Sequence, residues 1–242
     1  MKTLRAGFTT VRNLGDRGGV TMALRDAIAR GWVQGPRIVD SGMSISTSGG
    51  HMDARNAVND ETDAHTDHSN VCDGPESCRR AIRLQVSRGA DVIKFATTGG
   101  VNSGTGLLTR MEEEEARALV QTAKAYRRKV AVHAHGKEGV KLALRAGADS
   151  IEHGTEMDDE VIKLFRQTGA YYVPTLSTVN GYLERLAKDP NAYPPAVRKQ
   201  IDWRIGITGQ SLQKAYPAGV KIAFGTDAGV SKHGRNADEF EL

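Results

Sequence analysis

The chain has 242 residues, of which 39% are hydrophobic and 26% are charged, a composition typical of a globular α/β protein with a substantial core. The net charge is only +4, and the basic residues are scattered among acidic ones without a basic stripe, so no nucleic acid is expected as a partner. No stretch approaches the roughly 20 apolar residues that a membrane span needs, so no membrane span is expected either.

Short β-branched runs alternate with helical segments along the whole chain, which predicts repeated βα units without a linker. Strands are expected at 8–13, 37–42, 91–95, 130–136, 150–154, 171–176 and 220–226. Helices are expected at 22–30, 75–88, 109–128, 137–146 and 158–168, with an irregular-to-helical stretch over 179–216. Seven strands are one fewer than a closed (β/α)8 barrel requires. We therefore predict one incomplete TIM-like barrel domain over residues 1–242, truncated at both ends.

The polar segment 43–70 is longer than a simple connection between two elements usually is, and a lid or substrate loop is expected there. The two cysteines, Cys72 and Cys78, follow directly. They either form a small loop disulfide in an oxidising compartment or remain two thiols, and the spacing does not decide between these. Localisation stays open between the cytoplasm and export.

Polar side chains stand at the ends of successive apolar runs. They are Lys94, His133, His135, His153 and Asp227. Chemistry on a parallel barrel sits at the carboxyl ends of the strands, so these side chains are expected to meet there. Imidazole and carboxylate groups together suit zinc and other first-row divalent ions. The pattern predicts a metal-dependent hydrolase that acts on a small molecule.

Lys94 is the unusual member of this series, because a protonated lysine cannot bind a cation and its burial is costly. Two chemistries would explain it. Lys94 could react with carbon dioxide to give an anionic carbamate, or it could be a Schiff-base lysine with a depressed pKa. The accompanying histidines favour the carbamate.

Together these motifs resemble the amidohydrolase superfamily, and within it the imidazolonepropionase-like branch with its metal-dependent Xaa-Pro dipeptidases and carboxypeptidases. The resemblance covers essentially the whole chain. The motifs that carry it, in chain order, are Ala6-Gly7-Phe8-Thr9-Thr10-Val11-Arg12-Asn13, Gly49-Gly50-His51, Val92-Ile93-Lys94, His133-Ala134-His135-Gly136, Ile151-Glu152-His153-Gly154, Pro174-Thr175-Leu176 and Gly225-Thr226-Asp227-Ala228-Gly229.

This resemblance implies a binuclear zinc centre with a carboxylated Lys94 as the bridging ligand. His133 and His153 would be ligands of one metal ion, and Asp227 would be both a ligand and the general base. His135 would then face the pocket and contact substrate. A homo-oligomer is also compatible with the family.

Two further residues are candidates for substrate contact. His51 could bind a product carboxylate or could be a solvated loop histidine, and both readings stay open. Tyr182 lies beyond the strand at 171–176 and could help to select the substrate side chain.

The chain departs from the family pattern at its start. The first strand of the family carries a His-x-His pair that binds the second metal ion, and no such pair precedes Met1. We therefore expect a fragment that begins after the first barrel strand.

For the intact protein, the resemblance implies hydrolysis of an amide bond in an Xaa-Pro-like dipeptide or an N-acyl amino acid by a metal-bound hydroxide. A deaminase or cyclic-amide hydrolase on the same scaffold, a Schiff-base lyase and a catalytically inactive fragment are the alternatives.

Overall fold

The computed structural model describes residues 2–57, 65–103 and 106–242. Seven strands lie within these ranges: β1 (Thr10–Asn13), β2 (Arg37–Asp40), β3 (Val92–Ala96), β4 (Lys129–Ala134), β5 (Ser150–His153), β6 (Tyr171–Val173) and β7 (Lys221–Ile222). The α-helices are α1 (Lys2–Arg5), α2 (Val20–Ala29), α4 (Pro75–Ser87), α5 (Glu113–Ala125), α6 (Lys137–Ala146), α7 (Asp159–Thr168), α8 (Thr178–Lys188), α9 (Pro195–Gly206) and α10 (Gln210–Ala215), with 3-10 turns η1 (Ala54–Ala57) and η2 (Asn236–Phe240).

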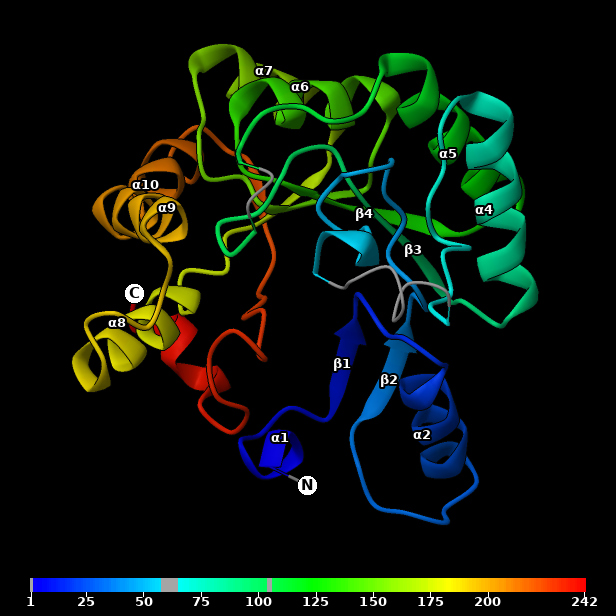
Figure 1. Cartoon of the computed structure of the whole chain (residues 1–242), viewed down its shortest axis with the longest axis horizontal. Coiled ribbons are helices and arrows are strands. Elements are labelled where there is room, and N and C mark those ends of the chain that lie inside the picture. The colour runs from blue at the N-terminus through cyan, green and yellow to red at the C-terminus, as the bar shows by residue number, and fades with distance from the viewer. Residues whose placement is uncertain (1, 58–64, 104–105) are drawn as a thin grey trace.

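All of the strand pairs are parallel. β3 to β7 form one sheet in chain order, and β1 pairs with β2. The segment around Ile45 connects the two groups, because its amide donates to the Lys94 carbonyl at 2.8 Å and its carbonyl accepts from Ala96 at 3.1 Å. The strands form an arc with the helices on its outer side (Figure 1). The incomplete TIM-like α/β barrel predicted from the sequence is confirmed.

The core lies between the outer face of the sheet and the helices. Side chains alternate along each strand, so every second one faces the helices. Strand β4 illustrates this, because Val130, Val132 and Ala134 are buried against helices while Ala131 and His133 face the barrel interior. The helices that complete this core present one apolar face each, as α7 does with Val161 and Phe165.

Helix ends are fixed by the expected local signals. The Glu112 and Glu115 side chains form a capping box at the start of α5, and the Asp158 carboxylate accepts from the Val161 amide at the start of α7. Helix α6 ends at Ala146 and is capped by Gly147, which has a φ of 95° that suits glycine. Because each helix begins and ends at a fixed residue, the loops between helices and strands are short.

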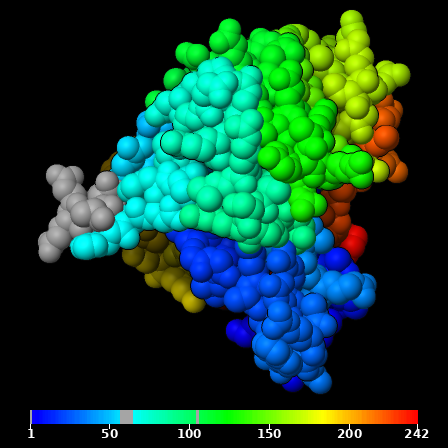
Figure 2. Space-filling view, turned by 90° about the vertical axis from the view of Figure 1, so that its right-hand side faces the viewer, coloured from blue at the N-terminus to red at the C-terminus, as the bar shows by residue number. Residues whose placement is uncertain are grey.

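The first βα unit packs below α4 and its neighbours, as the blue and cyan-green surfaces in Figure 2 show. Arg25 of α2 holds this contact, since it donates to the Gly89 carbonyl at 2.9 Å and pairs with Asp91 at 2.6 Å. The two ends of the arc meet where the Phe8 ring, before β1, stacks on Phe224, after β7, with 5.3 Å between ring centroids.

Two local features differ from the sequence expectation or go beyond it. The strand expected at 220–226 pairs only over Lys221–Ile222, and residues after it continue without ladder partners in the described sheet. Cys72 and Cys78 are joined in a disulfide, which settles the alternative that the spacing left open. In the described parts of segment 43–70, Ser46 bridges to Val71 beside this disulfide.

None of the described helices has the length and apolar character needed to cross a membrane.

Candidate metal centre

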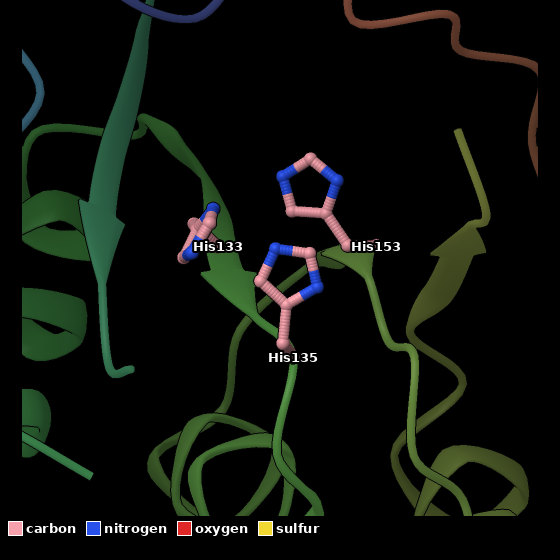
Figure 3. Close-up of side chains that lie close together, drawn as sticks. All are labelled: His133, His135 and His153. Atoms are coloured by element: carbon pink, nitrogen blue, oxygen red, sulfur yellow. The ribbon is translucent and has the colours of Figure 1, made fainter. Parts of the chain in front are cut away.

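Three histidines converge at the carboxyl ends of β4 and β5 (Figure 3). His133 lies in β4, His135 follows it by two residues on the same face, and His153 ends β5. One nitrogen from each ring lies within 4.8 Å of the other two, and all three side chains are buried. This spread is wider than the roughly 3.4 Å between two nitrogen ligands of one zinc ion, so any pair of these rings that binds one metal would have to draw together.

His153 reaches this cluster through an unusual backbone conformation. Ile151 faces the helices and Glu152 faces the barrel interior, so strict alternation would turn His153 outward. The φ of His153 is 74°, in the left-handed region that non-glycine residues rarely adopt. This turn directs the ring into the barrel mouth.

Hydrogen bonds fix the tautomers of two of these rings. The Gly99 carbonyl can only accept, so His133 Nε2 at 3.1 Å carries the proton and Nδ1 is left with a lone pair. The Thr175 hydroxyl donates to the Pro174 carbonyl at 2.7 Å, so its oxygen accepts from His153 Nδ1 at 2.7 Å and leaves Nε2 unprotonated. His135 Nδ1 also lies 2.8 Å from a hydroxyl, that of Thr155.

The same surroundings keep the three rings neutral. Burial lowers the pKa of His133, His135 and His153 well below the ordinary value, and neighbouring histidines and cations lower it further. Buried neutral imidazoles that share a small space and expose free lone pairs have the donor chemistry that zinc prefers. The residues present therefore fit a divalent metal.

Lys94 lies in β3 on the interior face, with a side chain only 4% exposed. Burial lowers its pKa to about 8, although the negative charges of Glu152 and Asp227 partly oppose the shift. Asp227 has a φ of 48°, and burial raises the pKa of its carboxyl while the charge of Lys94 lowers it. Lys94 and Asp227 thus lie within electrostatic range of each other inside the barrel.

The two further candidates lie close to the cluster. The His51 ring stacks on His133 with 4.3 Å between centroids, and burial lowers the pKa of His51 to about 4. Tyr182 is buried in a small apolar cluster with Val101 and Ile201, and burial raises its pKa to about 12. The negative charge of Asp227 raises the Tyr182 pKa further.

Sequence reasoning missed the side chains that hold the candidate ligands. Thr155 and Thr175 orient two of the histidines, and Arg204 is buried beside the turn that contains Thr175. Below the histidines, Arg12 of β1 pairs with the buried Glu152 of β5 at 2.8 Å. The threonines could have been found two residues after His153 and in the Pro174-Thr175 motif. Arg204 lies in the stretch 179–216, for which only an irregular-to-helical structure was predicted.

An α/β barrel with buried neutral imidazoles, a lysine and a carboxylate toward the carboxyl ends of its strands is an arrangement typical of metal-dependent barrel hydrolases. The comparisons with known proteins agree with this class. The chain belongs to the amidohydrolase family, whose model matches residues 1–241.

Individual relatives cover nearly the whole chain. The ochratoxinase of Aspergillus niger is 33% identical over 244 residues, which span 93% of this chain and 49% of that protein. A crystal structure of an Xaa-Pro dipeptidase with methionine bound in its active site is 45% identical, with a TM-score of 0.92 over 99% of this chain and 60% of that chain. A prolidase complexed with N-methylphosphonate-L-proline is 34% identical, with a TM-score of 0.82 over 93% of this chain and 56% of that chain. The chain thus spans about half to three fifths of the length of these relatives.

Proposed function

We propose that this protein hydrolyses an amide bond in a dipeptide, of the Xaa-Pro type, or in an N-acyl amino acid. The observation that carries the proposal is the buried cluster of neutral histidines at the carboxyl ends of β4 and β5, within electrostatic range of Lys94. The relatives support it, because their names describe a dipeptidase, a prolidase and an ochratoxinase.

The proposed metal ligands are Lys94, His133, His153 and Asp227. When bound, divalent metal, with zinc the first choice, would lower the pKa of water and polarise the scissile carbonyl. Lys94 would hold this metal as a carbamate, which forms when its neutral amine adds carbon dioxide and releases one proton. A lysine with a pKa of about 8 supplies that neutral amine close to physiological pH.

The charge inside the barrel links the carbamate to metal binding. Protonated Lys94 and Arg12 balance Glu152 and Asp227, so the interior is neutral with the amine charged. Carboxylation changes Lys94 from a cation to an anion and leaves two uncompensated negative charges. One divalent ion restores neutrality, so carbamate and metal should each stabilise the other.

The remaining steps belong to side chains of this chain. Asp227 would accept the proton of the attacking water and pass it to the departing amine, and its raised pKa suits that transfer. His135 and His51 would contact the substrate beside His133, on which both rings pack. Tyr182 would contact the substrate near Asp227.

Metal content tests the proposal first. The protein is expressed with zinc and bicarbonate, and metal per chain is measured by plasma mass spectrometry beside Lys94→Ala and the exposed control Lys163→Ala. About one metal ion per chain, lost only in Lys94→Ala, is expected for the cluster of Lys94, His133 and His153. A folded protein that takes up no metal would overturn the mechanism.

Substrate class is tested with libraries of dipeptides and N-acyl amino acids, with release of the free amine as the readout. Borohydride trapping in the presence of substrate separates the Schiff-base alternative, because only an imine on Lys94 would be reduced to a stable adduct. Release of ammonia instead of an amino acid would indicate the deaminase alternative.

A further inference from the structure

The turn that follows β6 spans residues 174–177 and adopts a strained conformation beside the histidine cluster. Thr175 has a φ of 51°, which is costly for a β-branched residue. Such a conformation persists only where the surroundings fix it from several sides. The contacts of this turn should therefore show which residues hold it in this conformation and which site residue it positions.

A buried arginine binds the carbonyl groups of the turn. Arg204 of α9 is 2% exposed, and its Nη2 donates to the carbonyls of Pro174 and Thr175 at 3.3 Å each. Among the described residues, no carboxylate lies within salt-bridge distance of this guanidinium. Its positive charge is directed instead at the peptide groups of a single turn.

A glutamate binds the amide groups of the same turn. One oxygen of Glu239 in η2 accepts from the Leu176 amide at 2.7 Å, and the other accepts from the Ser177 amide at 2.7 Å. Arg204 and Glu239 lie 35 residues apart in sequence and approach the turn from different elements. Together they bind both kinds of backbone polar group, carbonyls with a cation and amides with an anion.

The clamped turn has one contact with the proposed metal ligands. The Pro174 carbonyl accepts a hydrogen bond from the Thr175 hydroxyl, which leaves the lone pairs of the Thr175 oxygen to accept from His153 Nδ1. His153 must therefore present Nε2, without a proton, toward His133 and His135. If the turn relaxed, the hydroxyl could rotate or withdraw, and the His153 ring could protonate either nitrogen.

We propose that Arg204 and Glu239 are positioning residues, which clamp residues 174–177 so that Thr175 fixes the His153 tautomer and presents Nε2 as a preorganised metal ligand. This inference rests on the proposed metal function for its biological purpose. The tautomer itself is a property of the metal-free protein and can be measured without any activity.

The first readout is long-range proton–nitrogen NMR on metal-free protein labelled with nitrogen-15 histidine, with His153 assigned by His153→Gln. We expect Nδ1 protonated and Nε2 unprotonated in the wild type and in Thr175→Ser, which keeps the hydroxyl. Thr175→Val has nearly the same shape but no acceptor, and we expect it to give a mixture of tautomers. Thr21→Val, on α2 and remote from the histidines, is the matched control and should leave His153 unchanged.

The second readout is the zinc dissociation constant, measured by competition with a chelator. Loss of the oriented hydrogen bond in Thr175→Val should weaken binding about ten- to hundredfold. Glu239→Gln, which puts an amide donor in place of one acceptor oxygen, and Arg204→Met should weaken it in the same direction, with Arg204→Lys partly restoring it.

The outcomes separate this inference from the proposed function. If Arg204→Met and Glu239→Gln lower stability but leave the His153 tautomer and the zinc dissociation constant unchanged, the positioning role is overturned. An unchanged tautomer in Thr175→Val overturns it as well, even if Arg204→Met fails to fold. A wild type that binds no zinc but shows the expected tautomers would overturn the proposed function and retain the clamp.

Discussion

Replacement of Lys94 by methionine should stabilise the metal-free protein at neutral pH. The Lys94 side chain is 4% exposed, and burial lowers its pKa from 10.5 to about 8. Each pKa unit corresponds to about 1.4 kcal/mol between the two protonation states, so protonated Lys94 costs the folded state about 3 kcal/mol. Methionine has a similar length and no charge, so Lys94→Met should recover up to that amount, less the cost of leaving the buried Asp227 carboxylate without the charge of Lys94.

The pH dependence of this effect follows from the direction of the pKa shift. The folded pKa, about 8, lies below the unfolded value of 10.5, so between these values the unfolded chain binds more protons than the folded one. The free energy of unfolding of the wild type therefore rises between pH 8 and pH 10.5 as Lys94 loses its proton. The advantage of Lys94→Met should be fully present below pH 8 and should disappear as the pH approaches 10.5.

The assay is urea unfolding of both proteins at several pH values between 7 and 10.5, with a chelator and without carbon dioxide. The difference between the two proteins cancels the titration of groups that do not interact with Lys94. The same substitution at the exposed Lys163 controls for the loss of one positive charge. A stability difference that does not change with pH, or a Lys94→Met variant that is less stable at pH 7, would refute the assignment of Lys94 as a destabilised buried cation.

Two further predictions concern the scaffold. The Cys72–Cys78 disulfide closes a loop with a sequence separation of 6, and its reduction should lower the free energy of unfolding by about 2 kcal/mol, measured by urea unfolding with and without reductant; an unchanged midpoint would contradict this. A Cβ at Gly181 in α8 would lie 2.4 Å from the Val230 carbonyl oxygen, so Gly181→Ala should cost about 1–3 kcal/mol. A Cβ at Gly206 in α9 would have no heavy atom within 4 Å, so Gly206→Ala should stabilise the protein by about 0.5–1 kcal/mol. Thermal unfolding of both variants tests the pair, and equal shifts in melting temperature would show that the two sites do not differ as described.

Local sequence patterns were sufficient for the barrel scaffold. Strand β4 shows why, since its apolar residues fall at alternate positions and its two-residue period assigns one face to the helices. The same period placed His133 and His135 on one interior face, and the structure brings both into the cluster. Both predictions succeeded because they depend only on residues that are close together in the sequence.

The parts that could not be predicted depend on backbone geometry and on distant contacts. Alternation directs His153 toward the helices, and only its φ of 74° turns it into the barrel. The contacts of Arg204 and Glu239 with residues 174–177 join segments up to 63 residues apart, and no local pattern specifies them. The length of β7 was overestimated because an apolar run shows where a strand can form but not where its partner ends.

The arrangement of the strands makes the proposed ligands unequal. Lys94 and His133 come from β3 and β4, and His153 ends the next strand, so three paired strands set the spacing of these three side chains. Ladder hydrogen bonds hold this spacing before any metal arrives. Asp227 lies five residues beyond the two-residue β7, and the isolated bridge between Ala228 and Ser231 follows it directly. We therefore expect the Lys94, His133 and His153 group to carry most of the affinity for a first metal ion, while Asp227 contributes proton transfer from a less constrained position.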